Sequence, residues 1–293
     1  MPFNHKHTFK VRHYECDAHN HLNHANYLRY MQESMLEASA AVGYDIGRYE
    51  TLGTVWLPQQ IDIEYLGAVL YSETVEVTTW VGDLEGARAH HHHECRSLST
   101  GDLVARADTA WIYCDRQTHQ PIATPDAMIP ALLPDAPMPA PTPHKDPPTP
   151  PPPPTPFVME RRVEWRDTDQ DGHVNDAAFL NYFVECVIAA SAAVGWPVAR
   201  TLGAGFGFVA RRHHMIHHQR AVIGDVLRIE SYISNVRRSS ARRHYMITRA
   251  RDNAPIMEGF SIWMFVNMET GRLTRIPEDA HADFAATIAE AHA

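Results

Sequence analysis

Residues 17–28 read DAHNHLNHANYL, and residues 169–180 read DQDGHVNDAAFL. The likeness continues without a gap to Gly43 and Gly195, with 13 of 27 aligned positions identical. A repeat of this length, 152 residues further along the chain, indicates that a whole domain has been duplicated. Each copy places a carboxylate, a histidine and an amide directly before a helical pattern, so the repeated segment also points to chemistry.

The rest of each copy predicts the same order of elements. The first copy predicts a strand at 7–15, a helix at 24–42 and strands near 55–66, 72–83, 88–98 and 103–114. The second copy predicts a strand at 157–166, a helix at 176–194, strands near 206–217, 224–236, 241–251 and 256–266, and a last helix at 278–291. One long helix among antiparallel strands is an α+β pattern, in which the sheet can curl around the helix and bury it.

A proline-rich segment separates the two copies. From Pro134 to Pro156, 13 of 23 residues are proline, a density that excludes a helix or a central strand. We therefore expect a first domain at 1–133, a polyproline-II-like or disordered linker at 134–156, and a second domain at 157–293. A ligand for an SH3-type module is the alternative for this segment, although a linker already explains the composition.

Length, composition and net charge exclude some classes of function. The chain has 293 residues, of which 44% are hydrophobic, and a net charge of −9. These values suit two packed cores and argue against nucleic-acid binding. We find no signal peptide, no 18-residue apolar run and no CxxC among the four cysteines. The sequence therefore predicts a cytoplasmic protein with reduced thiols and no membrane span.

The repeated motif resembles that of the hotdog-fold thioesterases of the 4-hydroxybenzoyl-CoA thioesterase superfamily, and also that of the tandem acyl-ACP thioesterases. The likeness covers both repeats. It implies a tandem hotdog: two antiparallel sheets, each wrapped around a long central helix, joined as an intrachain pseudo-dimer. It also implies that the loop aspartates, here Asp17 and Asp169, are the catalytic carboxylates, and that the acyl thioester lies between two hotdog units.

The residues themselves suit thioester hydrolysis, which needs a base or nucleophile near the carbonyl carbon and donors near its oxygen. The loop aspartate could supply the first, and the free N–H groups and dipole of the following helix the second. The loop histidine could contact the substrate or be satisfied by backbone, while an asparagine at a helix start favours a structural cap. The candidate catalytic residues are Asp169, Asp17, His173, His21, Asn175 and Asn23.

The copies differ at the turn between their third and fourth strands. The second copy carries there the basic and hydroxyl residues Arg237, Arg238, Ser239, Ser240, Arg242 and Arg243. Guanidinium groups bind phosphate bidentately, and coenzyme A carries a pyrophosphate and a 3′-phosphate. This turn is therefore a candidate site for coenzyme A in the second copy only, with an ordinary exposed basic turn as the alternative.

We expect neither a metal nor a separate cofactor, since coenzyme A enters as part of the substrate. The four histidines of His90–His93 alternate between the faces of a strand, so at most two could converge on an ion. The sequence thus predicts an acyl-CoA thioesterase that forms a homodimer of didomain chains. The alternatives are an acyl-ACP thioesterase, a hotdog hydratase or dehydratase, and a non-catalytic acyl-CoA-binding protein.

Overall fold

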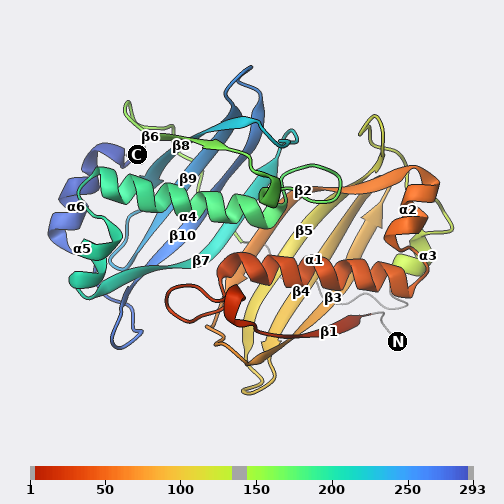
Figure 1. The fold of residues 1–293 in the computed structure, drawn as a ribbon, viewed down its shortest axis with the longest axis horizontal. Helices are drawn as coiled ribbons and strands as arrows, with labels where there is room; N and C mark the ends of the chain where they lie inside the picture. The colour runs from red at the N-terminus through yellow and green to blue at the C-terminus, as the bar shows by residue number, and fades with distance from the viewer. Residues whose placement is uncertain (1–3, 134–143, 290–293) are drawn as a thin grey trace. The chain divides into compact units, whose positions relative to one another are not determined.

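The computed structural model describes residues 4–133 and 144–289 (Figure 1). The chain divides into two compact units, residues 1–144 and 145–293, and the division falls inside the expected linker. Part of that linker, 134–143, lies outside the described residues, so the polyproline-II expectation stays a prediction there.

The first unit has the expected order of one strand, one long helix and four strands. Its elements are β1 (His5–Lys10), α1 (His24–Ala41), α2 (Ile46–Leu52), β2 (Thr54–Tyr65), β3 (Thr74–Glu85), β4 (Arg88–Ser97), β5 (Leu103–Asp115) and α3 (Ile129–Leu132). The strands pair antiparallel in the order β1-β3-β4-β5-β2, so β1 lies at an edge of the sheet.

The second unit repeats this order. Its elements are β6 (Phe157–Arg162), α4 (Asp176–Ala193), α5 (Val198–Gly203), β7 (Phe206–His217), β8 (Val226–Ser234), β9 (Ser240–Arg249), β10 (Pro255–Asn267) and α6 (Glu278–Phe284). Its strands pair antiparallel in the order β6-β8-β9-β10-β7. Figure 1 shows α1 and α4 each lying along one face of the sheet of its own unit.

Two expected strands are shorter than the pattern indicated. Strands β1 and β6 end at Lys10 and Arg162, and a single 3₁₀ turn follows each of them. The acidic residue that ends each turn accepts a hydrogen bond from the backbone amide before the turn, at 2.7 Å for Glu15 and 2.9 Å for Asp167. The backbone amides of Glu15 and Asp167 in turn donate to the carbonyls of Arg12 and Glu164, both at 3.0 Å, so each turn is closed and the chain leaves the strand there.

Both long helices begin at the predicted residue because an asparagine caps each of them. The Oδ1 atom of Asn23 accepts from the amide of Ala25, and Oδ1 of Asn175 accepts from Ala177, both at 2.9 Å. The structural role favoured for these asparagines is therefore confirmed.

Replacing Asn175 by alanine should lower the free energy of unfolding by about 0.5–2 kcal/mol, because the amide of Ala177 loses its acceptor. Chemical denaturation would measure the loss. Asn175→Ser keeps a capping oxygen and should cost much less, so equal losses in the two variants would contradict the capping role.

The buried face of each helix packs on its own sheet. In the first unit, Leu28 and Met31 of α1 and Ile61 and Ile63 of β2 are at most 1% exposed. In the second unit, the fully buried side chains include Leu180, Phe183, Met215, Leu227 and Ile229. Burial of these large apolar groups holds each helix on its sheet and so fixes where the helix begins.

Helix α4 is long and apolar enough to cross a membrane by length and composition, with a mean hydropathy of 1.3 over 18 residues. However, 61% of this window is buried inside the structure, as for other helices packed on a sheet, so the feature is weak support for a span. Asp176, Asn181 and Glu185 interrupt this window, so it is not a continuous apolar run, and the absence of a membrane span stays a prediction.

The described part of the expected linker, residues 144–156, contains no helix or strand. It is held against the rest of the second unit through the side chain of Asp146 and the backbone of Pro150. Asp146 binds the guanidinium groups of Arg212 and Arg242, at 2.9 and 2.5 Å, and the carbonyl of Pro150 accepts from the hydroxyl of Tyr232 at 2.7 Å. This segment therefore has a defined path along the second unit.

Candidate active site

The two candidate loops are closed by the same hydrogen bonds. In the first repeat, Oδ1 of Asp17 accepts from the backbone amides two and four residues further on, at 2.9 and 3.2 Å. In the second, Oδ1 of Asp169 accepts from the equivalent amides at 3.0 and 3.1 Å. The amide of each aspartate also donates to the carbonyl four residues on, at 2.8 Å. The carboxylate is thus part of the loop's framework.

These bonds use only one of the two carboxylate oxygens. Within residues 4–133 and 144–289, Asp17 and Asp169 make no side-chain hydrogen bond or ion pair beyond those through Oδ1. Asp169 is exposed and Asp17 is half-buried, so solvent reaches both. A carboxylate with one oxygen held and the other accessible can act as an oriented base or nucleophile.

The loops turn at a residue in the left-handed backbone region. This residue is Asn20 in the first repeat, with φ of 61°, and Gly172 in the second, with φ of 77°. Glycine adopts this conformation without strain, and asparagine is among the few other residues that tolerate it. The difference between the two motifs therefore leaves the shape of the loop unchanged.

The loop histidines fix the loop to a neighbouring segment through their backbone. His21 pairs with Leu70 and His173 pairs with Val222, each as an isolated antiparallel bridge. Both histidines are half-buried. Their backbone therefore shapes the loop, and contact of their side chains with a substrate stays a prediction.

The start of each helix has fewer available amides than the sequence suggested. In α1 the second amide, that of Ala25, donates to the side chain of Asn23, and the third donates to the carbonyl of Asn23 at 2.8 Å. The same two amides of α4 are bonded to Asn175, each at 2.9 Å. The expectation that these N–H groups are free is wrong, and the positive end of the helix dipole remains to polarise a carbonyl.

A buried acid–imidazole contact lies at the start of α4, and the sequence analysis missed it. An oxygen of Asp176, the first helical residue, is 3.2 Å from Nε2 of His217, the last residue of β7, and both side chains are at most 6% exposed. Burial lowers the pKa of His217 to about 3, so its imidazole is neutral at neutral pH.

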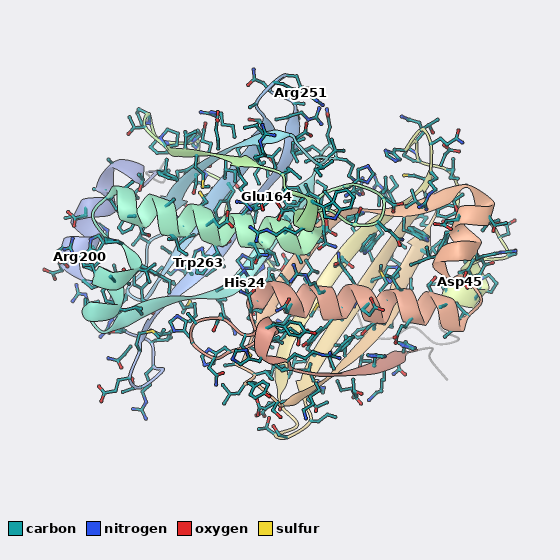
Figure 2. The ribbon with its side chains drawn as sticks, viewed as in Figure 1. His24, Asp45, Glu164, Arg200, Arg251 and Trp263 are labelled. Carbon is teal, nitrogen blue, oxygen red and sulfur yellow. The ribbon has the colours of Figure 1, made fainter. Side chains whose placement is uncertain are left out.

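The first repeat has a different pair at the equivalent positions. These hold His24, which Figure 2 labels at the start of α1, and Tyr65. The hydroxyl of Tyr65 donates to the carbonyl of His24 at 3.1 Å. The first helical residue is therefore a histidine in α1 and an aspartate in α4, and the aspartate contacts the side chain of His217 on the neighbouring strand.

A tyrosine on each helix supports the turn that precedes the loop. The hydroxyl of Tyr30 donates to Oε2 of Glu15 at 2.7 Å, and that of Tyr182 donates to Oδ2 of Asp167 at 2.8 Å. Burial, together with the hydrogen bond to the neighbouring carboxylate, raises the pKa of both hydroxyls. These neutral tyrosines hold each loop at a fixed position relative to its helix.

The arginine turn does not form the cluster that the sequence predicted. Arg237 and Arg238 are exposed, and Ser239 and Ser240 are half-buried. Arg242 and Arg243 are 6% and 4% exposed, and because they are neighbours on β9 they lie on opposite faces of the sheet.

The partners of the two buried arginines show this separation. Arg242 is bound to Asp146 at 2.5 Å, whereas Arg243 donates to Oγ of Ser231 at 3.2 Å. A four-arginine phosphate site is therefore excluded by the period of the strand. Arg237 and Arg238 remain as the exposed cationic pair.

A narrow apolar pocket, partly open to solvent, lies in the second unit. It is bounded by the second half of α4, by the sheet and by α6. Its lining includes Val187, Ile233, Trp263, Phe265, Phe284 and Ile288. Such a lining can hold an acyl chain or another apolar group.

Comparison with known proteins gives a consistent family relationship. A family model described as the thioesterase-like superfamily matches residues 11–132 and again 163–284, one match in each repeat. A chloroplastic acyl-[acyl-carrier-protein] hydrolase of Cuphea viscosissima is 21% identical over 188 residues, covering 61% of this chain and 46% of the relative. A provisionally named acyl-CoA thioesterase of Bacillus subtilis is 27% identical over 117 residues, covering 40% of this chain and 84% of the relative.

The chain spans about half the length of the Cuphea relative. Among solved structures, a provisionally named oleoyl thioesterase of Lactobacillus plantarum superposes with a TM-score of 0.73 at 14% identity, covering 94% of this chain and 98% of that one. At this identity the likeness concerns the fold, which is of the hotdog-like thioesterase type in two repeats.

Proposed function

We infer that this chain, which belongs to the thioesterase-like superfamily, hydrolyses acyl thioesters. The observation that carries the proposal is the pair of loop carboxylates, each with one oxygen held by two backbone amides and each a few residues before a capped helix start. The relatives named as an acyl-ACP hydrolase and an acyl-CoA thioesterase support the same class of reaction.

In the proposed reaction, the accessible oxygen of Asp17 or Asp169 takes a proton from water as the water oxygen attacks the thioester carbonyl carbon. The carbonyl oxygen becomes an oxyanion, which the positive end of the helix dipole stabilises. Collapse of this intermediate breaks the carbon–sulfur bond and releases the acid and the thiol, which takes up the proton. Direct attack by the carboxylate, with later hydrolysis of the anhydride, is the other route open to the same residue.

We propose acyl-CoA as the substrate and acyl-ACP as the alternative. Arg237 and Arg238, exposed in a protein of net charge −9, could attract the phosphates of either carrier. The apolar pocket of the second unit is the candidate binding site for the acyl group.

We further propose that the two repeats form a pseudo-dimer, that two chains form a homodimer and that the protein is cytoplasmic. Light scattering can test the homodimer against the chain mass of 33.1 kDa.

Release of free thiol from a panel of acyl-CoAs, with one matched acyl-ACP, tests the proposed function. Aliphatic chains of increasing length and one aromatic acyl group should separate the substrate classes, with protein alone as the control for its own cysteines. Hydrolysis of at least one acyl-CoA is the expected result. Tight binding without thiol release across the panel would instead support a non-catalytic acyl-CoA-binding protein.

The different residues at the starts of α1 and α4 predict that the two candidate active sites have different kcat values. The carboxylate of Asp176 occupies the positive end of α4, where it opposes negative charge that develops on a thioester oxygen. In an Asp17→Asn background, Asp176→Asn should therefore raise kcat about two- to thirtyfold, since charge–dipole terms are about 0.3–2 kcal/mol. Asp171→Asn, which alters the exposed loop instead, should not. A fall in kcat with Asp176→Asn would show that Asp176 assists the reaction.

A further inference from the structure

Strand β1 lies beside α1 in the first unit (Figure 1). Three side chains with metal-binding atoms come together there, from His5 and His7 of β1 and Glu37 of α1. His5 and His7 are two residues apart on a strand, so both lie on the same face. Glu37 comes from the later part of α1. One nitrogen of each imidazole and one oxygen of Glu37 all lie within 4.8 Å of one another.

One of the two distances matches a coordination shell, whereas His7 and Glu37 are in direct contact and would have to move apart to admit an ion. Nε2 of His5 is 3.4 Å from Oε2 of Glu37, and Nδ1 of His7 contacts the same oxygen. Two ligands of a tetrahedral zinc ion with bonds of about 2.0–2.1 Å are about 3.3 Å apart. The side chains are 21%, 34% and 37% exposed for His5, His7 and Glu37, so water can reach the group and the side chains can adjust.

The second repeat shows what the fold alone requires at these positions. There the equivalent residues are Phe157 and Met159 on β6 and Ala189 on α4, all apolar. Strand β6 alternates between half-buried and exposed residues in the same way as β1. Packing of the strand beside the helix therefore does not demand two histidines and a glutamate, and their joint presence in the first repeat calls for another reason.

We propose that His5, His7 and Glu37 bind one divalent transition-metal ion of the zinc class, with water in the fourth position. Two imidazoles and one carboxylate suit such ions, whereas calcium and magnesium prefer sites built only from oxygen atoms. The ion would link the edge strand β1 to α1. This site departs from the sequence expectation of no metal, which considered only His90–His93, and it is independent of thioester hydrolysis.

Calorimetric titration of the EDTA-treated protein with zinc chloride tests the proposal. The key variant carries His5→Phe, His7→Met and Glu37→Ala, the residues that the second repeat already accommodates at these positions. It should bind one zinc ion fewer per chain than the wild type and should lose the rise in Tm that zinc gives. Glu37→Gln, which hardly changes the side-chain volume but removes the charged ligand, should weaken binding at this site by at least the roughly 10–100-fold that loss of an outer-shell partner costs.

The chain has 20 histidines, so adventitious binding needs a matched control. His90→Ala with His218→Ala removes two exposed histidines elsewhere and should leave the site intact. Cobalt(II) provides a second readout, because a four- or five-coordinate site gives visible d–d absorption that the triple variant should lose and the control should keep. Equal zinc stoichiometry and affinity in wild type, triple variant and Glu37→Gln would overturn the proposal and leave an ordinary imidazole–carboxylate contact.

Discussion

Turnover of acyl thioester should fall about 10²–10⁴-fold when Asp17 and Asp169 are both replaced by asparagine. Asparagine keeps an Oδ1 acceptor for the two loop amides that each aspartate holds, so the loops should stay closed. The variant loses the negative charge that makes the other oxygen a base or nucleophile. Steady-state thiol release measures kcat, and each single variant gives the share contributed by its own repeat.

The chain contains its own control for the structural part of this substitution. Asp115 accepts from the amides of Gln117 and Thr118 at 3.0 and 2.8 Å, and the equivalent Asn267 makes the same two bonds at 3.1 and 2.8 Å. An aspartate and an asparagine thus close the same kind of turn. Asp115→Asn should leave both stability and kcat unchanged, and unchanged kcat in the Asp17/Asp169 double variant would refute the role of the loop carboxylates.

Removal of the Asp146 carboxylate should lower the free energy of unfolding by about 2–4 kcal/mol. Asp146 holds Arg212 through two bonds of 2.9 Å and Arg242 through one of 2.5 Å, and the arginine side chains are only 5% and 7% exposed. Loss of one partner of a buried ion pair costs about 3–5 kcal/mol, and the 26% exposure of Asp146 reduces that figure. Chemical denaturation of Asp146→Ala would measure the loss.

A solvent-exposed aspartate–arginine pair provides a control for the loss of stability expected in Asp146→Ala. Asp279 lies 3.4 Å from Arg200, with side chains 60% and 45% exposed, so Asp279→Ala should cost at most about 1 kcal/mol. Equal losses for Asp146→Ala and Asp279→Ala would contradict the anchoring of the linker segment by buried arginines.

The same ion pair predicts a dependence of stability on pH. Burial acts to raise the pKa of Asp146, but the guanidinium groups of Arg212 and Arg242 outweigh it and hold that pKa below its ordinary value of 3.8. A depressed pKa gives stability that is present above the unfolded value and lost as pH falls through the folded value. The difference in stability between wild type and Asp146→Asn should therefore shrink as the pH falls below about 4.

The fold could be predicted from the sequence because local signals and burial agree. Asn23 and Asn175 mark the first residues of two apolar helices, and the same strand pattern follows each helix. The first strand of each repeat is shorter than predicted, because Glu15 and Asp167 cap a turn that follows it. The alternation of residue types along the strand does not reveal such a turn. Side-chain capping of this kind depends on geometry that residue types alone leave open.

The candidate site was only partly predictable. The loop aspartates were found through their repetition, whereas the contact of Asp176 with His217 joins residues 41 positions apart and needs the placement of β7 beside α4. The sequence analysis expected too many arginines to converge on one phosphate site. Adjacent residues of a strand face opposite sides of the sheet, so Arg242 and Arg243 bind different partners. Contacts between distant elements were therefore the part that the sequence left undetermined.

The most direct test is a crystal structure of the Asp17→Asn/Asp169→Asn variant with an acyl-CoA that the wild type hydrolyses. The thioester carbonyl carbon should lie beside residue 17 or 169, within hydrogen-bond reach or one bridging water of its side chain, with the carbonyl oxygen toward the start of α1 or α4. A thioester bound away from both loops would contradict the account.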